Sequence, residues 1–276
     1  MVTQLLLAKR LFIEACQYAD EHDAFACGLA VSLLQDATEI LVWALIKEKG
    51  IAVKEGSAFT MNLELLQKAG VSVPEAPKLL ELNKARVGFK HYGNLPAPSE
   101  AQKHRTYVED FLRGTIKAQF GRDFDDLSLV DLVPFDDIKV RLKAAEELVK
   151  KSEFRDAVRE ASIAKVELFS KLSIYVPRVD GHITKVDGLL SQAGLGNTKV
   201  FGYLAGYLGN LRDISLVTLL RLPLNDYAFL NTTLFIASKS VSGKWTTLDT
   251  KLAKPDEATC RRQISCLVDI SIRLQG

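Results

Sequence analysis

The sequence predicts an all-α protein, and three of its properties lead to this prediction. Apolar residues recur every three or four positions over long stretches, the spacing that gathers side chains on one face of a helix. The period-two alternation of half-buried strands is nearly absent. The 276 residues, 47% of them hydrophobic and 25% charged, are enough for one large domain or two small ones, each with its own core.

The first part of the chain, residues 1–121, is predicted to form a helical bundle. Asp23 is the expected N-cap of its most apolar helix, which should be central, and Ser99 is the expected N-cap of its last helix. Glycines that suit a left-handed stop follow several of these helices. The expected helices span residues 3–20, 23–50, 62–70 and 99–120, with a further helix between Pro74 and the loop at Gly93.

Residues 122–137 read as an acidic, proline-broken connector, and residues 138–276 as a second helical domain. Residues 142–164 loosely echo residues 8–31, so the second domain could be a degenerate repeat of the first. Two short apolar runs within residues 234–248 could pair weakly as strands. The expected helices of this part span residues 138–151, 153–175, 185–192, 199–222 and 256–275.

Charge and hydropathy exclude several classes of protein. The 36 Lys and Arg offset 34 Asp and Glu, so the net charge argues against a general coat for nucleic acid and leaves only local basic patches. The most apolar stretch, residues 24–46, contains Gln35, Asp36 and Glu39 and is not expected to span a membrane. The first residues lack the order of a secretory signal. We therefore expect a cytoplasmic protein with reduced cysteines.

The motifs of common enzymes are missing. Residues 194–199, GLGNTK, lack the Gly-Lys-Ser/Thr ending of a phosphate loop. The four histidines, His22, His91, His104 and His182, are not spaced to place two imidazoles on one helix face. The chain also has no Gly-x-Ser-x-Gly nucleophile elbow. We expect neither a metal site nor a cofactor.

One segment, residues 81–93 (ELNKARVGFKHYG), has the composition of a reactive site. Arg86 and His91 stand at the end of a polar helix, before a glycine-punctuated loop. Fourteen arginines and four histidines would produce this spacing by chance in roughly one chain in five, so the spacing alone is weak. The positions of the residues on the helix strengthen the case for a site, because Asn83, Arg86 and Lys90 share a helix face and His91 lies at the end of the helix.

The surroundings of this segment are more basic than the chain as a whole. Lys84, Lys103 and Arg105 add positive charge, which attracts phosphate. The rings of Tyr92 and His104 lie between these residues in the sequence and could stack on bases. We therefore expect RNA to bind here, through Lys84, Tyr92, Lys103 and Arg105.

The run Asn83-Lys-Ala-Arg86-Val-Gly-Phe-Lys-His91-Tyr-Gly, at the end of a late helix in a helical bundle, resembles the HEPN superfamily (higher eukaryotes and prokaryotes nucleotide-binding domains). The resemblance covers about residues 1–121. Members with Arg-x4-His are commonly metal-independent endoribonucleases of toxin, phage-defence and RNA-processing systems. They act as dimers that join two motifs across one cleft.

The resemblance implies a role for each motif residue. Arg86 would contact the scissile phosphate and stabilise its developing charge, and His91 would transfer a proton during attack by the ribose 2′-hydroxyl. Some members carry a polar residue directly after the arginine, where this chain has Val87. That departure leaves Asn83 or Lys90 for the supporting role.

In some members of the superfamily an acidic residue of the long second helix orients the motif. In this chain the resemblance assigns that role to Asp36 or Glu39. The chain holds one full motif, since Arg178 and His182 are one residue short of it. A site of two motifs would therefore come from a homodimer.

The residue types suit RNA cleavage without a metal. Attack by the 2′-hydroxyl of the RNA itself needs a proton acceptor that titrates near neutral pH and a cation for the pentacoordinate phosphate. Histidine and arginine supply both.

Two other interpretations stay open. In a purely structural one, Arg86 pairs with an acidic neighbour such as Glu81 or Asp110, and His91 caps its helix by bonding a terminal carbonyl. In the other, the protein is a non-catalytic helical interaction or RNA-binding module. It would act with an operon-encoded protein partner, with residues 138–276 as the partner surface.

Overall fold

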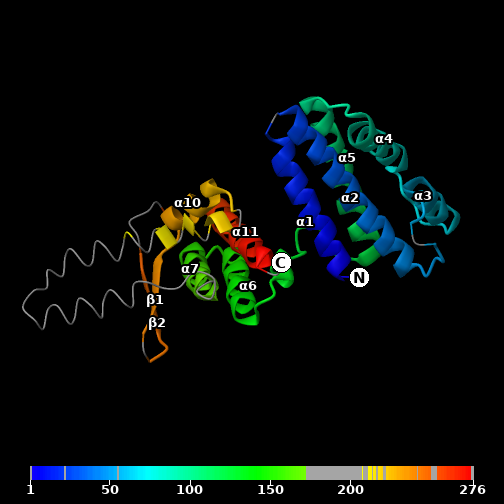
Figure 1. The fold of residues 1–276 in the computed structure, drawn as a ribbon. Coiled ribbons are helices and arrows are strands. Elements are labelled where there is room, and N and C mark those ends of the chain that lie inside the picture. Colours follow the sequence, from blue (N-terminus) through cyan, green and yellow to red (C-terminus); the bar gives the residue numbers. More distant parts are fainter. Residues whose placement is uncertain are drawn as a thin grey trace, which may run out of the picture. The chain divides into compact units, whose positions relative to one another are not determined.

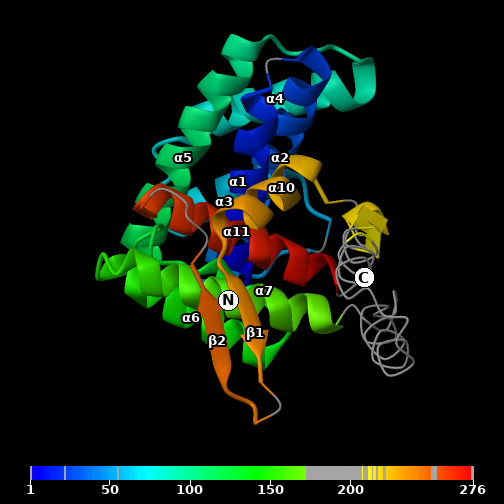
Figure 2. The same ribbon diagram turned by 90° about the vertical axis from the view of Figure 1, so that its left-hand side faces the viewer.

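The computed structural model describes residues 2–21, 23–54, 56–171, 222–240, 242–249 and 254–274, with several single residues between 207 and 219. The chain divides into two compact units, unit 1 (Met1–Asp131) and unit 2 (Leu132–Gly276). Both units are built mainly from helices, and the described residues form one sheet of two strands (Figures 1 and 2). The predicted all-α class is confirmed.

Unit 1 is a helical bundle built around α2. Every other helix of the unit contacts α2, so the prediction that this helix is central is confirmed. Its side chains are buried around much of its circumference, and for this reason its sequence is so uniformly apolar. The helices are α1 (Val2–Ala19), α2 (Ala24–Glu48), α3 (Phe59–Lys68), α4 (Ala76–Tyr92) and α5 (Pro98–Phe120).

By length and composition alone, α2 could also cross a membrane, since its most apolar window has a mean hydropathy of 1.6. In the structure, 67% of that window is buried inside the protein. Burial by neighbouring helices is what a core helix of a bundle shows. The cytoplasmic location stays a prediction.

The N-termini of two helices in unit 1 test the N-caps that were predicted from the sequence. The carboxylate of Asp23 accepts a hydrogen bond from the N–H of Ala26 at 2.9 Å, so the predicted cap of α2 is confirmed. The predicted cap of α5 is wrong. That helix begins at Pro98, after Ala97, and Ser99 lies inside its first turn. Proline suits the first helical position because its φ is preset and it has no N–H to satisfy.

The acidic connector does not stand apart from the bundle. Phe124 and Leu127 are buried, and the Phe124 ring packs edge-on against Phe12 of α1 with centroids 5.8 Å apart. The Lys9 ammonium donates to the carbonyls of Phe124 and Leu127 at 2.8 and 2.7 Å. Unit 1 therefore extends to Asp131, past the predicted end at residue 121, and a short 3-10 helix spans Leu129–Leu132.

Unit 2 contains the expected hairpin of helices, α6 (Asp136–Lys150) and α7 (Phe154–Lys171), followed by α10 (Leu224–Thr233), β1 (Ile236–Lys239), β2 (Trp245–Leu248) and α11 (Glu257–Arg273). The weak strand pair is confirmed, since Ile236 pairs with Leu248 and Lys239 with Trp245 in an antiparallel ladder. The helix expected over residues 185–192, most of the one over 199–222 and the end of the one over 153–175 lie outside the described residues. The degenerate repeat stays a prediction.

A close contact joins α2 to α4. A Cβ atom added at Gly28 would lie 2.2 Å from Cε2 of the Phe89 ring. The ring therefore occupies the space that any larger residue at position 28 would need. The contact also joins the last turns of α4 to the first turns of α2.

Replacing Gly28 by alanine should destabilise unit 1 by about 1–3 kcal/mol, because the added methyl group would displace the Phe89 ring. Urea unfolding followed by circular dichroism measures the change. Gly114→Ala on α5 is the matched control, since a Cβ there meets nothing within 4 Å. That substitution should stabilise by about 0.5–1 kcal/mol, the helix-propensity difference. Equal effects of the two substitutions would contradict the tight packing.

Candidate functional site

Arg86 occupies a core position of α4. The apolar residues of α4 that face the bundle include Leu79 and Leu82, both fully buried, and Phe89. Together with Arg86 they are spaced by three, four and three residues, which places all four on one helix face. The Arg86 side chain is consequently half-buried, as is that of Asn83 beside it.

The helix that faces Arg86 is α2. Because Phe89, near the end of α4, packs on Gly28, near the start of α2, the two helices can contact along their length only if they run antiparallel. The figure shows the same arrangement within unit 1 (Figure 1). One turn back along α4, Arg86 therefore lies opposite the next turn of α2, which carries Ser32 and Gln35.

These facing turns form a polar seam inside the bundle. We call Ser32, Gln35, Glu39 and Arg86 the α2–α4 polar seam. Gln35 is fully buried, and its amide donates to the Glu39 carboxylate at 2.9 Å. Ser32 Oγ, Gln35 Oε1 and Arg86 Nε are buried without a hydrogen-bond partner among the described residues. Since buried polar atoms are nearly always bonded, residues selected for packing alone would not leave three such atoms on facing turns.

Arg86 has no counter-ion in the part of the chain that the structure describes. Glu81, one acidic partner considered from the sequence, binds Lys103 instead. Asp36 and Glu39, the acids expected to orient the motif, are half-buried on α2, but neither forms an ion pair with the guanidinium. A half-buried cation without a counter-ion is unfavourable for folding. It also produces a local positive potential that attracts an anion.

His91 is exposed in the last turn of α4. The end of α4 is capped by the backbone, where the N–H of Gly93 bonds the carbonyl of Phe89 at 3.2 Å. The imidazole itself makes no hydrogen bond to any described residue. At ~100° per residue, His91 lies ~140° around the helix axis from Arg86. The two motif residues of one chain are therefore presented on different faces and do not converge.

The predicted RNA-binding residues fall into two groups. Lys84 and Tyr92 are exposed on α4, as is Lys90, which was expected to support the motif, and 75% of the Tyr92 surface is accessible. Lys103 and Arg105 on α5 are instead held in ion pairs with acidic residues of unit 1. They also point to different sides of α5, because they are two residues apart on a helix. The basic surface near Arg86 is thus smaller than the sequence suggested.

The expectation that His104 is available to stack on a base is wrong. This residue is fully buried on α5, with its ring edge-on to that of Tyr107 and the centroids 6.0 Å apart. Neither ring nitrogen has a hydrogen-bond partner among the described residues. Burial lowers the pKa of His104, with a smaller lowering by Lys103 and opposing contributions from Glu81 and Glu100. The imidazole is therefore neutral in the folded protein at neutral pH.

The four cysteines are free thiols, three of them buried and Cys16 half-buried. Burial raises the pKa of Cys16 and of Cys260 to about 11 and that of Cys266 to about 12. A thiol with so high a pKa is almost entirely protonated at neutral pH and is a poor nucleophile.

Sequence reasoning did not single out Phe25, Gly28 or Ser32. The signal that would have found the last two is the spacing of small and polar residues within an apolar helix. Gly28, Ser32, Gln35 and Glu39 recur every three or four positions, which marks one face of α2 as different from the rest.

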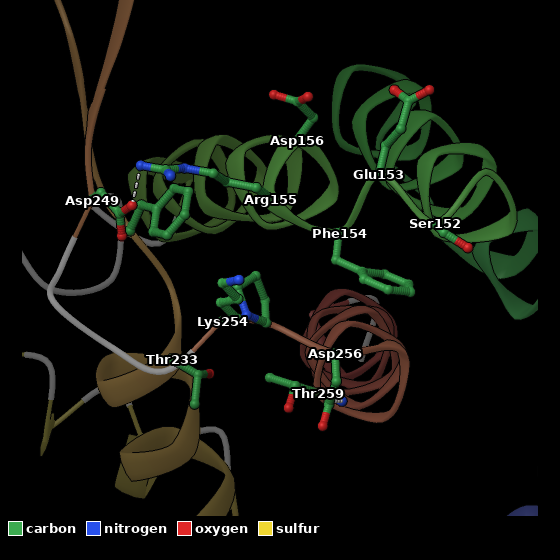
Figure 3. Close-up of a pocket in the computed structure, with 12 residues that line it drawn as sticks. Ser152, Glu153, Phe154, Arg155, Asp156, Thr233, Asp249, Lys254, Asp256 and Thr259 are labelled. Atoms are coloured by element: carbon green, nitrogen blue, oxygen red, sulfur yellow. Dashed lines mark hydrogen bonds and ion pairs between the residues drawn. The ribbon is translucent and has the colours of Figure 1, made fainter.

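Unit 2 contains a separate cavity of about 560 Å³. It is lined by the first residues of α7, the residues just before α11 and Asp249 after β2 (Figure 3). An ion pair joins Arg155 to Asp249 on one side, and the Asp256 carboxylate accepts from the N–H of Thr259 at 2.7 Å. Carboxylates outnumber cations in the lining, so the cavity is not suited to phosphate. No predicted site residue lies in it.

Replacing Arg86 by methionine tests whether the arginine serves the fold. Methionine would complete the apolar face of α4 and remove a charge that has no counter-ion in the described part of the chain. The free energy of unfolding of unit 1 should therefore rise, by on the order of 1 kcal/mol. Arg105→Met is the control, because Arg105 has a counter-ion in Asp20 at 3.0 Å and its loss should give no gain. A loss of several kcal/mol in Arg86→Met would identify a structural arginine.

The stability of unit 1 should fall in mild acid because of His104. The pKa of His104 is lowered in the folded state and returns to about 6.5 on unfolding, so below that pH unfolding takes up a proton. The free energy of unfolding therefore decreases as the pH falls through about 6.5. Urea midpoints at about pH 7.5 and about pH 5.5 measure the effect, and His104→Leu should remove most of it. An unchanged pH dependence in that variant would contradict the assignment.

Comparisons of this chain with models of protein families, with curated proteins and with solved structures find no match. The family resemblance of residues 1–121 therefore stays a prediction. The function is inferred from the residues themselves, chiefly Arg86, His91 and the α2–α4 polar seam.

Proposed function

We propose that the protein is a metal-independent endoribonuclease in which Arg86 and His91 carry the reaction. The observation that most supports this is the state of Arg86, a half-buried cation in a core position of α4 with no counter-ion among the described residues. An arginine retained in this state fits a role in binding an anion from outside the bundle. The surrounding segment resembles the HEPN superfamily, and from that resemblance we infer that the anion is an RNA phosphate.

The guanidinium is suited to the scissile phosphate because it can donate two parallel hydrogen bonds to a pair of phosphate oxygens. Its charge would stabilise the pentacoordinate transition state, in which negative charge accumulates on those oxygens. His91 would accept the proton of the attacking 2′-hydroxyl or donate one to the leaving 5′-oxygen. Histidine suits this role because the residue type titrates near neutral pH.

The site in this proposal is shared between two copies of the chain. Arg86 and His91 of one α4 point ~140° apart, so one phosphate is served more readily by Arg86 of one copy and His91 of another. A homodimer that brings the ends of two α4 helices together would form two such sites. Asn83 and Lys90 lie near enough on α4 to support the phosphate contact.

The resemblance also suggests a setting. Related motifs occur in bacterial defence and toxin-antitoxin systems, and we propose a cytoplasmic enzyme of that type whose activity is restrained or triggered by an operon-encoded protein. Residues 138–276 would supply the surface for that protein.

The proposal is tested with purified full-length protein and a single-stranded RNA in excess EDTA. Cleavage should proceed and leave a 2′,3′-cyclic phosphate or its opened product, and DNA should survive because it lacks the 2′-hydroxyl. Arg86→Ala and His91→Ala should each slow cleavage at least about 100-fold. Arg122→Ala, at an exposed position, is the matched control and should cleave normally. Cleavage that EDTA abolishes, or equal cleavage of DNA, would contradict the mechanism.

The shared site is tested by mixing the two inactive variants. If Arg86 and His91 act from different copies, roughly a quarter of the wild-type rate should return, because half of the dimers are mixed and each of these has one complete site of two. Light scattering establishes that the variants still associate. No recovery in a mixture shown to contain mixed dimers would mean that both residues act from the same copy.

A second candidate function is a non-catalytic RNA-binding or interaction module. The divergence of Arg86 and His91 around α4 favours it, since an arginine can bind phosphate without help from the histidine. This candidate predicts RNA binding that depends on Arg86, no cleavage under any condition, and no effect of His91→Ala. The cleavage assay and a binding assay with the same RNA separate the two functions.

A further inference from the structure

Phe25 is a large apolar residue that stays exposed beside the motif. It is the second residue of α2, and 58% of its surface is accessible. Its ring stands edge-on to that of Phe89, with centroids 6.1 Å apart and planes at 64°. Because Phe89 is itself fixed in the space above Gly28, the Phe25 ring is supported on one side and open to solvent on the other.

The residues around Phe25 suit a nucleic acid. On α4, Arg86 lies one turn before Phe89 and Tyr92 one turn after it. At ~100° per residue, each is ~60° around the helix axis from Phe89, so the two flank the ring on opposite sides. Tyr92 is 75% exposed. The acidic residue nearest to Phe25 in the sequence is Asp23, whose carboxylate is bound to a backbone N–H in the first turn of α2. An aromatic surface is therefore bordered by a cation, Arg86, that has no counter-ion among the described residues.

We propose that Phe25 is a base-stacking residue, which holds an unpaired nucleobase of single-stranded RNA next to the phosphate bound by Arg86. The inference rests on the proposed function and adds the class of substrate. A stacked ring and a neighbouring guanidinium match the alternation of base and phosphate along a strand. In duplex RNA the bases are stacked on one another and paired, so they cannot reach Phe25.

The test measures binding in the His91→Ala background, so that cleavage does not interfere. The probe is a short single-stranded RNA with 2-aminopurine at one position, a base whose fluorescence changes when it stacks on an aromatic ring. Phe25→Ala should weaken binding about 10-fold, within the range for loss of one base–aromatic stack. It should also remove the fluorescence change. The salt dependence of binding should keep its slope, because no phosphate contact is lost.

Two variants serve as controls. Phe25→Trp should bind the RNA at least as well, since tryptophan offers a larger stacking surface. Met61→Ala removes an apolar side chain on α3 that is exposed to a similar extent, 54%, and should bind as the parent does. An equal loss of RNA affinity in Phe25→Ala and Met61→Ala would mean that exposed apolar surface in general contributes to binding. That result would overturn the inference.

The other outcomes separate this inference from the proposed nuclease. Unchanged affinity in Phe25→Ala, or an equal loss of affinity for duplex RNA, would overturn the stacking role alone. A loss of self-association in Phe25→Ala, measured by light scattering, would assign the ring to a contact between copies of the chain and would also overturn it. RNA that binds through Phe25 without being cut would support the inference and contradict the nuclease. No binding of RNA by the parent would overturn both.

Discussion

The arrangement of unit 1 depends on the contact between the Phe89 ring and the backbone of Gly28. Glycine at position 28 leaves room for the ring, and the ring then fixes how far along α2 the end of α4 lies. Two consequences follow from that register. Arg86, one turn back, faces the buried polar residues of α2, and His91, half a turn on, emerges at the exposed end of α4. The same ring supports Phe25 at the surface.

The polar seam between α2 and α4 is unfavourable for a helical bundle. Three buried polar atoms, on Ser32, Gln35 and Arg86, have no hydrogen-bond partner among the described residues, and the arginine has no counter-ion there. Positions 79, 82, 86 and 89 form the stripe that packs α4 on α2, and a leucine at position 86 would fit that stripe better. Residues that conflict with good packing are expected where a protein binds a ligand or catalyses a reaction. For this reason we place the site at the α2–α4 polar seam.

Much of the fold could be predicted from local signals. The helices of unit 1, the α6–α7 hairpin, the Asp23 cap and the short strand pair each depend on a few neighbouring residues, and the structure reproduces them. Ser99 failed as a cap because the adjacent proline starts the helix first. The extension of unit 1 beyond residue 121 was not predicted, because it depends on a contact between Phe124 and Phe12, which are far apart in the sequence.

The candidate site shows the same limit of local signals. The spacing of Arg86 and His91 is visible in the sequence, but the burial of His104 and the ion pairs of Lys103 and Arg105 depend on other helices. The central claim is that the half-buried guanidinium group of Arg86 binds an RNA phosphate. NMR of its guanidinium group, in isotope-labelled protein titrated with an uncleavable 2′-O-methyl RNA, tests it most directly. The Arg86 Nε–H signal should shift and exchange more slowly with water, while that of Arg122 should not. An Arg86 signal unchanged at saturating RNA would contradict the claim.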